Sequence, residues 1–498
     1  MHKRTILIGL IAVAVLAVVG VVLVLQFGKP EQASTRAYWP TQDWKISTPE
    51  EQGLDSVKLA ELLKMIQDGN ILIDSLLVIR NGSIVLDAYF NDPYDGTFPH
   101  DMASVTKSVM TTLIGIAADQ GRINLDQPVV SFFPDRTVAN LDERKEGMTV
   151  RHLASMANGF QSGCMSDDQG TIERMMSNSD WVQSALDRKM AAEPGTIFCY
   201  DSPGMHLLSA ILQEATGMTA LEFAQKNLFK PLGIREEVWE SDPQGYTRGW
   251  GDLHLKPRDA AKIGYLWLNK GVWDDKQIVS SDWVEEAVKP HSQTGNYGYG
   301  WWISEDGYSA SGRAGQSINI APALNAIVVT TGSGFSFDEI SYYLQEAVID
   351  PDNPLPANPE GVAQLEAALA SLEQAPTPFP AEPLPEIAKA ISGKTYVFEP
   401  NSASIKSLDL EFNDSAQAMV HILVENSDNI QDWPIGLNGE YRVAPNGYAL
   451  RGYWQDSQTF ILEIFDIGQM TYQLHFEDDR LLLEAPLYGI KAEGQVEN

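Results

Sequence analysis

The sequence predicts a mixed α/β (α+β) domain, an antiparallel sheet flanked by helices with a helical subdomain beside it, followed by a small C-terminal antiparallel β domain. Three observations predict this fold class. A helical segment is followed by a β-hairpin, which argues against a doubly wound parallel sheet. Helical patterns then dominate to about residue 344, and strand-like segments return only at the end of that stretch. Beyond residue 387 the hydrophobic residues alternate with a period of two.

The first elements supply one half of the predicted sheet. The segment "TPEEQGLDSVKLAELLKMIQDG" is typical of a loop and an amphipathic helix that ends at Gly69. It is followed by "DSLLVIRNGSIVLDAYFN", in which Asn81-Gly82 is a strong hairpin signal. The segments "YGYGWWIS" and "SINIAPALNAIVVTTG" add late strands. The sheet is therefore expected to be assembled from both ends of the domain.

Helices fill the region between these strands. In "TALEFAQKNLF", Thr219 and Glu222 have the spacing of a capping box. Two more helices, "PRDAAKIGYLWLNKG" and "SDWVEEAVKP", end at Gly271 and Pro290. These patterns place the first domain at residues 47–350.

The C-terminal part begins with a proline-rich stretch. Residues 351–386 are expected to form a semi-rigid linker that contains one short helix. Residues 387–498 consist of short alternating strands with Asn-Gly and Asp-Asp turns, which indicates a β-barrel or a sandwich. No catalytic constellation occurs there, so a binding or packing role is expected.

The N-terminus predicts export. A basic head, residues 1–4, precedes an uncharged apolar run at residues 5–27 that is long enough to cross a bilayer. The charge bias predicts a cytoplasmic head, a transmembrane signal anchor, a linker at 28–46, and the rest of the chain on the periplasmic or extracellular side. A cleaved signal peptide is the alternative. The net charge of -32 over 498 residues argues against binding to nucleic acid.

The segment "PHDMASVTKSVMTTLIGIAADQG" carries the main chemical signal. Ser104 and Lys107 lie three residues apart, so on a helix they share one face. A serine hydroxyl needs a base, and an amine can serve if burial or nearby cations lower its pKa from about 10.4 in water. A lysine in the first turn opposes the helix dipole, and the same dipole would help to keep it neutral.

Other residues give weaker signals. The spacing of Cys164 and Cys199 matches no zinc site, and a disulfide or two buried thiols are equally consistent with the sequence. No metal-ligand spacing occurs, and we predict no metal and no cofactor. The absence of a G-x-S-x-G elbow argues against an α/β-hydrolase. Asp201 and the acidic loop at residues 165–170 are expected to be solvated, and a substrate-facing role for that loop is the alternative.

Aromatic and histidine side chains complete the candidate set. Trp301 and Trp302 alternate across a strand, so one is expected in the core and the other at the cleft. His254 and His291 are expected to have structural roles.

The ordered motifs resemble those of the serine β-lactamase and penicillin-binding-protein superfamily, in particular its class C-like branch with family VIII esterases and 6-aminohexanoate-dimer hydrolases. "ASVTKS" resembles the nucleophile segment, "EPGTIFCYDSPGMHLLSAIL" the Y-x-N segment, and "YGYGWW" with "SGRAGQSINIAPALNAIVVTTG" the strand pair that bears the third motif. The resemblance covers residues 47 to 345 and implies the β-lactamase fold, with the site in a groove between the sheet and the helical subdomain.

The resemblance implies roles for individual residues. Ser104 would be the nucleophile, Lys107 its proton acceptor, and Tyr200 the general base and then the acid for the leaving group. The backbone N–H groups of Ser104 and Gln316 would form the oxyanion hole. A Cys164–Cys199 bond, if formed, would brace the residue before Tyr200.

Three departures from the family pattern concern substrate binding. Ser202 stands where the family has asparagine, and its hydroxyl could still bond Lys107. In "RAG", Arg313 would anchor a substrate carboxylate, and Gly315 would permit a close approach of the strand to Ser104. Ala314 replaces a hydroxyl residue that contacts the substrate carboxylate, which argues against β-lactams.

The sequence therefore predicts a membrane-anchored serine hydrolase that cleaves a small ester, amide or peptide-like substrate through an acyl-enzyme on Ser104. The first alternative is a cell-wall D-amino peptidase or β-lactamase. The second is a catalytically degenerate protein that only binds its ligand.

Overall fold

The computed structural model describes residues 38–91, 94–162, 164–372, 383–424 and 429–497. The predicted head and signal anchor, residues 1–27, lie outside this described part. Within it, no helix is both long enough and apolar enough to span a membrane.

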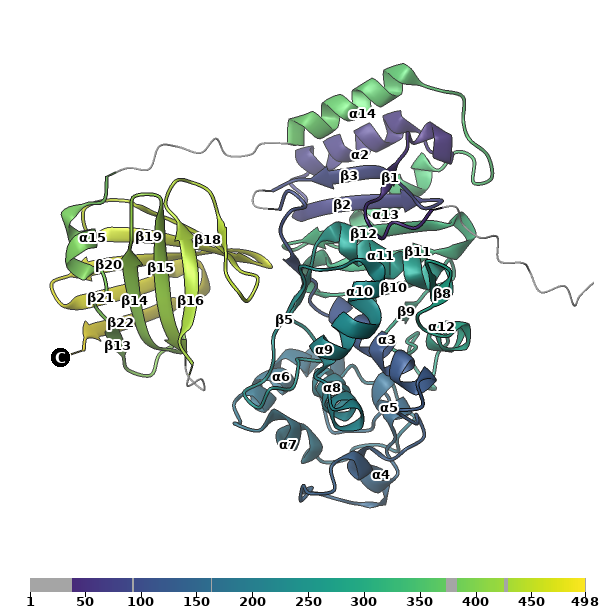
Figure 1. Cartoon of the computed structure of the whole chain (residues 1–498), viewed down its shortest axis with the longest axis horizontal. Helices are drawn as coiled ribbons and strands as arrows, with labels where there is room; N and C mark the ends of the chain where they lie inside the picture. Colours follow the sequence, from purple (N-terminus) through teal and green to yellow (C-terminus); the bar gives the residue numbers. More distant parts are fainter. Residues whose placement is uncertain (1–37, 92–93, 163, 373–382, 425–428, 498) are drawn as a thin grey trace, which may run out of the picture. The chain divides into compact units, whose positions relative to one another are not determined.

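A seven-stranded sheet forms the framework of the first domain (Figure 1). Its strand order is β1-β3-β2-β12-β11-β10-β9, and every pairing is antiparallel except that of β1 with β3. The early strand β2 pairs with the late strand β12, with Val78 opposite Val328. The expectation that the sheet is built from both ends of the domain is thus confirmed. The strands are β1 (Lys45–Ile46), β2 (Ile73–Arg80), β3 (Ser83–Tyr89), β9 (Trp302–Ile303), β10 (Tyr308–Ser311), β11 (Ser317–Ala321) and β12 (Ala326–Gly332).

The predicted hairpin joins β2 and β3. Asn81 and Gly82 have φ angles of 50° and 79°. Two consecutive positive φ angles are what a two-residue type I′ turn requires, and Asn-Gly is the pair that adopts them most readily.

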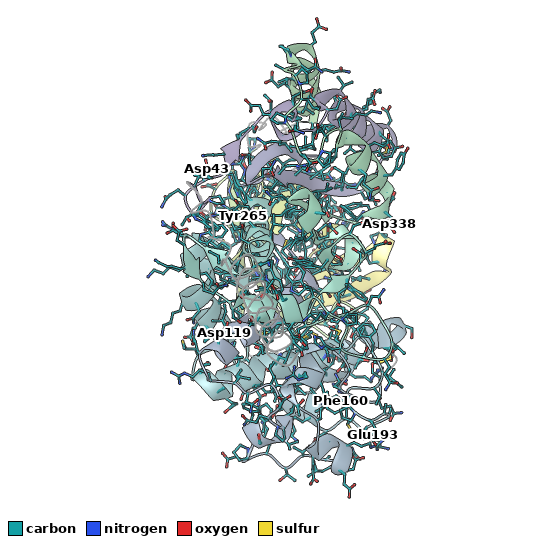
Figure 2. The ribbon with its side chains drawn as sticks, turned by 90° about the vertical axis from the view of Figure 1, so that its right-hand side faces the viewer. Asp43, Asp119, Phe160, Glu193, Tyr265 and Asp338 are labelled. Carbon is teal, nitrogen blue, oxygen red and sulfur yellow. A yellow bond between two sulfur atoms is a disulfide. The ribbon has the colours of Figure 1, made fainter. Side chains whose placement is uncertain are left out.

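Helices cover both faces of this sheet. α2 (Ser56–Asp68), α13 (Asp338–Ala347) and α14 (Pro359–Leu372) share one hydrophobic cluster with β2 and β3. α11 (Pro257–Leu268) packs against β11 and β12. Its Tyr265, labelled in Figure 2, makes edge contacts with Trp44 and Trp273.

The position of α14 differs from the sequence prediction, which placed this segment in a linker. Leu365 and Leu372 are seven residues apart on one face of α14, and both are buried in the cluster that includes α2. The helix therefore completes the core of the first domain, and the folded part of that domain extends to Leu372.

The helical region lies below the sheet in the view of Figure 1. Its centre is formed by α3 (Val105–Asp119) and α8 (Ser202–Thr216), which are buried along most of their length. The surrounding helices are α4 (Glu143–Glu146), α5 (Val150–Ala154), α6 (Asp168–Met176), α7 (Trp181–Leu186), α9 (Ala220–Ala224), α10 (Lys230–Leu232) and α12 (Ser281–Ala287).

Short strands connect the start of α3 to the rest of the domain. β4 pairs with β6, and the backbone N–H of Met102 donates to the carbonyl of Leu253 at 2.9 Å. This pairing places the residues before α3 beside the segment around Trp250. These strands are β4 (His100–Asp101), β5 (Val238–Trp239) and β6 (Leu253–Leu255), and a separate pair is β7 (Val272–Trp273) with β8 (Lys276–Gln277).

The C-terminal domain contains a ten-stranded sheet with its own hydrophobic core. A pairing of β16 with β18, Gly436 opposite Arg451, joins one end strand of the sheet to the strand next to its other end and makes the sheet barrel-like. Of the two predicted architectures, the structure shows the barrel. Its elements are α15 (Glu386–Ile391), β13 (Tyr396–Phe398), β14 (Ile405–Phe412), β15 (Gln417–Val424), β16 (Gln431–Gly436), β17 (Arg442–Val443), β18 (Ala449–Trp454), β19 (Thr459–Asp466), β20 (Gly468–Glu477), β21 (Arg480–Ala485) and β22 (Ile490–Val496).

Candidate active site

Ser104 occupies the N-cap position of α3 without a capping hydrogen bond from its side chain among the described contacts, and Lys107 lies in the first turn of that helix. The Lys107 side chain is 1% exposed. Its Nζ donates to Ser104 Oγ at 2.7 Å and to the Trp250 carbonyl at 2.8 Å. The hydrogen bond to Ser104 is the contact that a serine nucleophile needs for loss of its proton.

The backbone before Ser104 is held in an uncommon conformation. Ala103 has a φ of 46°, in the left-handed region that an alanine adopts only at a cost of about 1 to 2 kcal/mol. The Asp101 carboxylate accepts the Ala103 N–H at 2.8 Å, and Asp101 is 2% exposed. This buried contact stabilises the sharp turn that presents Ser104 at the start of the helix.

Tyr200 lies near the amine of Lys107. The Lys107 Nζ is 4.9 Å from the centroid of the Tyr200 ring, and the Trp302 ring stacks on that tyrosine with its centroid 5.9 Å away and an interplanar angle of 11°. Trp301 is fully buried, whereas Trp302 lines the pocket. The two tryptophans therefore face opposite sides, as their alternation predicts.

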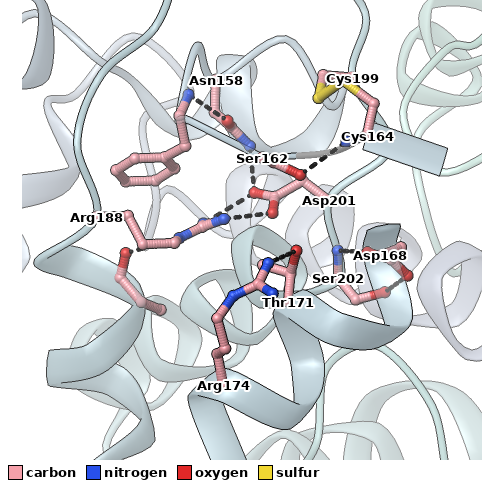
Figure 3. Close-up of polar contacts among 12 residues, drawn as sticks. Asn158, Ser162, Cys164, Asp168, Thr171, Arg174, Arg188, Cys199, Asp201 and Ser202 are labelled. Carbon is pink, nitrogen blue, oxygen red and sulfur yellow. Dashed lines mark hydrogen bonds and ion pairs between the residues drawn. A yellow bond between two sulfur atoms is a disulfide. The ribbon is translucent and has the colours of Figure 1, made fainter. Parts of the chain in front are cut away.

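Contacts of three residues, Cys199, Asp201 and Ser202, fix the segment that carries Tyr200 (Figure 3). Cys199 forms a disulfide with Cys164, so of the two states that the sequence left open, the structure shows the bond. Asp201 is 1% exposed and forms a two-pronged ion pair with Arg188 at 2.5 and 2.9 Å. Asn158 also donates to Asp201, at 2.8 Å. The expectation that Asp201 is a solvated loop residue was therefore wrong.

Ser202 makes the third contact, and it differs from the expected one. Its hydroxyl donates to Asp168 Oδ2 at 2.6 Å, and its backbone N–H donates to Asp168 Oδ1 at 2.8 Å (Figure 3). Lys107 has no hydrogen bond to Ser202 among the described contacts. Asp168, expected in a solvated loop, instead lies half-buried at the start of α6.

The strand end that faces Ser104 lies earlier in the chain than "RAG". β10 ends at Ser311, and the next residue, Gly312, approaches the Ser104 turn so closely that an added Cβ would lie 2.9 Å from Ser104 N. Ser311, Gly312 and Arg313 line the same pocket as Ser104. The position predicted for Gly315, beside the nucleophile, is therefore occupied by Gly312.

Ala314, Gly315 and Gln316 lie away from the pocket lining. Residues 313–315 form a tight turn, and Ala314 has a φ of 63°. Gln316 is fully buried, and its side-chain amide bonds the carbonyl and the N–H of Gly332 at 2.6 and 3.0 Å. Its backbone N–H is directed at the Arg313 carbonyl, 3.5 Å away. This geometry disfavours the predicted oxyanion role of Gln316 and a direct substrate contact of Ala314.

Arg313 lies at the rim of the pocket. Its side chain is 61% exposed, and its Nη2 is 3.7 Å from Asp101 Oδ2. Burial raises the pKa of Asp101 to about 7. A guanidinium that is mostly exposed beside the nucleophile is available to a negatively charged group of a substrate.

The pocket brings most of the predicted residues together. Its volume is about 550 Å³, and its walls include Ile172 and Met176 of α6 and Trp302 of β9. A hollow of about 1030 Å³ lies on the C-terminal domain, and among its described lining residues no hydrogen bond joins Ser402 to Lys491, which pairs with Glu484 instead. The residues that share the smaller pocket are Ser104, Lys107, Asp168, Tyr200, Ser202 and Arg313.

No group of three or more His, Cys, Asp or Glu side chains in the described part of the chain is arranged to hold a metal ion. His291 stacks on Tyr299 with its centroid 3.9 Å away, and His254 is buried in β6. Neither histidine lines the pocket of Ser104.

Comparison with known proteins adds the decisive observation: the family profile described as Beta-lactamase matches residues 59–349, more than half of the chain. The chain belongs to the β-lactamase family. As a member of this family, it is a serine hydrolase.

Similar proteins include other β-lactamase-family members. The 6-aminohexanoate-dimer hydrolase of Paenarthrobacter ureafaciens is 25% identical over 52% of this chain and 72% of that protein. The β-lactamase of Escherichia coli K12 is 24% identical over 38% of this chain and 48% of its own length. The solved structure of a putative 6-aminohexanoate-dimer hydrolase from Bacillus anthracis has a TM-score of 0.48 at 21% identity and covers 63% of this chain and 82% of that one.

Proposed function

We propose that this serine hydrolase cleaves an ester or amide bond through an acyl-enzyme on Ser104. The observation that carries the proposal is the 2.7 Å hydrogen bond from a fully buried Lys107 to Ser104 Oγ, at the edge of a pocket. A buried amine whose contacts end on a serine hydroxyl is suited to proton transfer from that hydroxyl.

In the proposed mechanism, Ser104 Oγ attacks the substrate carbonyl carbon while its proton passes to the Lys107–Tyr200 pair. Tyr200 then donates a proton to the leaving oxygen or nitrogen, and the acyl group remains on Ser104. In the second half, water adds to the acyl carbon and loses a proton to the same pair. The bond between the acyl carbon and Ser104 Oγ then breaks, the acid leaves, and the pair returns the proton to Ser104 Oγ. The residues return to their starting protonation states.

We assign the oxyanion hole to the backbone N–H groups of Ser104 and Arg313. Gly312 brings the strand end against Ser104 N, and Arg313 is the next residue. Oxyanion donors stabilise charge that develops on the carbonyl oxygen, and loss of one donor in other enzymes costs about 3 to 4 kcal/mol of barrier.

The substrate class follows from Arg313 and the apolar walls. The exposed guanidinium is proposed to hold a carboxylate of the substrate, and Ile172, Met176 and Trp302 surround its less polar part. The similarity to 6-aminohexanoate-dimer hydrolases supports a small amide.

A D-amino peptidase or β-lactamase activity is the second candidate, and one observation favours it. Ser311 places a hydroxyl in the pocket beside Gly312. The sequence argument against β-lactams rested on Ala314, which does not line the pocket. Acylation by a fluorescent penicillin would support this candidate, whereas ester or amide turnover without penicillin labelling would favour the first.

We also propose that residues 5–27 anchor the protein in a membrane, with the catalytic domain in the periplasm or outside the cell. The uniform apolar run and the preceding basic residues support this location. Membrane fractionation with protease accessibility of the intact cell tests it. Recovery of the full-length chain only in the cytosolic fraction would contradict it.

A fluorophosphonate probe tests the proposed chemistry directly. We expect the purified protein to be labelled on Ser104, as shown by an intact-mass shift, and Ser104→Ala to remove the label. Lys107→Ala and Tyr200→Phe should lower the labelling rate by about 100-fold or more, since general base catalysis contributes about 10² to 10⁴. Ligand binding without labelling or turnover would instead indicate the degenerate binding protein.

A further inference from the structure

Ser202 occupies the position where the family resemblance implied an amide, and its contacts show a different use. Its hydroxyl and its backbone N–H both donate to Asp168, one to each carboxylate oxygen. A carboxylate that receives two hydrogen bonds from one residue has a defined orientation. Because Ser202 is two residues after Tyr200, Asp168 is attached to the segment that carries this tyrosine (Figure 3).

Asp168 also belongs to the catalytic pocket. It lines that pocket together with Ser104 and Lys107. Burial raises the pKa of Asp168, while the positive charge of Lys107 and the hydrogen bonds from Ser202 act in the opposite direction. The described part of the chain shows no ion pair to Asp168, so no cation within ion-pair distance neutralises this carboxylate directly.

Three groups surround the Lys107 amine. Ser104 Oγ and the Trp250 carbonyl accept from Nζ, and the face of the Tyr200 ring lies 4.9 Å away. A hydrogen-bond acceptor and an aromatic face both stabilise an ammonium.

The other charged groups of the pocket have nearer partners than Lys107. Asp101 lies 3.7 Å from Arg313, and Arg248 pairs with Asp252 at 2.8 Å and with Glu240 at 2.6 Å. Among the described residues, Asp168 is thus the carboxylate of this pocket that has no ion-pair partner of its own, so its negative charge can interact with Lys107.

We propose that Asp168 is a positioning residue of the active site, whose carboxylate, oriented by Ser202, supplies the negative charge that balances the Lys107 ammonium. This inference rests on the proposed function, in which Lys107 helps to take the proton of Ser104. It concerns Asp168, a residue outside the predicted motifs. In this chain, Ser202 orients an acid from α6 that lines the same pocket as Lys107.

The test is the pH dependence of fluorophosphonate labelling, in which Ser104 Oγ bonds to phosphorus and fluoride leaves, in Asp168→Asn and Asp168→Ala. Loss of a nearby negative charge makes an ammonium easier to deprotonate, so the acid limb of the rate profile should move to lower pH by about one unit or more. This limb reports the Lys107–Tyr200 pair as a unit. Asp168→Glu, which keeps the charge, should restore most of the wild-type profile.

Asp167→Asn is the matched control. Asp167 is adjacent to Asp168 but pairs with Arg174 at the surface, where both side chains are about half exposed. Its variant should leave the acid limb in place. The inference is overturned if Asp168→Asn leaves the acid limb unchanged, even when the plateau rate falls, because a plateau loss alone indicates a structural role. An equal shift in Asp167→Asn would also overturn it.

A second measurement separates this inference from the proposed function. If the wild-type protein is not labelled at all, the proposed function fails. Titration of the Lys107 side chain by NMR in ¹³C-lysine protein, with its signal identified by loss in Lys107→Ala, then decides the inference. We expect the signal to titrate at lower pH in Asp168→Asn than in the wild type, and coincident titration curves would refute the charge balance.

Discussion

Lys107 is a long charged side chain that has been removed from water almost completely. An ammonium in such a place is unfavourable unless acceptors surround it. Here Ser104 Oγ and the Trp250 carbonyl accept from it, and the ring face of Tyr200 lies nearby. These contacts lower the cost of burying the Lys107 amine. They also hold the amine against the serine hydroxyl, so the same contacts that stabilise the buried lysine help to activate Ser104.

The close approach of Gly312 to Ser104 predicts the effect of a substitution on the labelling rate. An alanine Cβ would lie 2.9 Å from Ser104 N, from the Met102 carbonyl and from the Ala103 methyl. Because these neighbours are mostly backbone, the strand end must move away from Ser104, and we expect Gly312→Ala to lower the fluorophosphonate labelling rate by about 100-fold.

Gly251→Ala is the control for that substitution. Gly251 lines the same pocket, but an added Cβ there has no neighbour within 4 Å. This variant should be labelled at nearly the wild-type rate. Equal rates for both variants would show that the approach of Gly312 to Ser104 does not matter for acylation.

At the scale of elements, a disulfide and two hydrogen bonds link α6 and the turn before it to the start of α8. The Cys164–Cys199 bond precedes Tyr200, and the Asp168–Ser202 contacts follow it. Between them, Asp201 is held by Arg188, whose guanidinium lies 4.2 Å from the centroid of the Phe160 ring. Phe160, labelled in Figure 2, comes from the loop after α5. Tyr200 is thus positioned by contacts from several elements of the helical region.

The disulfide predicts how reduction changes the stability of the protein and its labelling rate. It closes a loop with a sequence separation of 35 residues, for which chain entropy implies a stabilisation of about 3 to 4 kcal/mol. We expect a reducing agent to lower the melting temperature of the wild-type protein and to slow its labelling by the fluorophosphonate, because the segment before Tyr200 is released.

The double variant Cys164→Ala/Cys199→Ala is the control for reduction. Its melting temperature should already be low and should not respond to the reducing agent. A wild-type melting temperature that stays constant, with two free thiols counted by mass spectrometry, would contradict the prediction.

The elements also show where sequence reasoning succeeds. The Asn81-Gly82 turn, the two-ended sheet and the pairing of Ser104 with Lys107 depend on residues close in sequence or on strong periodicity, and they could be predicted. Asp168 could not, because its partner Ser202 lies 34 residues away and only the tertiary fold brings them together. The resemblance of "RAG" to the third motif predicts Gly315 beside Ser104, whereas the structure places Gly312 there. The register of β10 with β11, in which Ser311 lies opposite Ser317, decides between them.

For the whole molecule, the C-terminal sheet and the cluster around α2 have distinct main hydrophobic clusters, and a further small cluster groups Tyr94 with Tyr441, Ala449 and Phe465. The cluster of the C-terminal domain draws its buried residues from Ile391 to Ala492 and includes no residue of the first domain. The cluster around α2 ends with Leu372 of α14. A domain with its own core can fold alone when it buries enough apolar surface.

A fragment of residues 383–498 tests this separation. We expect it to be soluble and to unfold in one cooperative thermal transition, with the far-UV circular dichroism of an antiparallel β protein. The complementary fragment, residues 38–372, should retain fluorophosphonate labelling. Loss of the cooperative transition in the isolated C-terminal fragment would show that its core depends on the first domain.

The pairing of Gly436 with Arg451 has a consequence for how the C-terminal domain can meet other molecules. Strand addition, in which an extended peptide extends a sheet, needs a row of free backbone N–H and C=O groups. A sheet that is joined back on itself leaves few such groups. Recognition by this domain is therefore expected to use side chains of the barrel surface and its loops. Partners should be selected by the shape and charge of those side chains, which can change from one relative to another without disturbing the barrel.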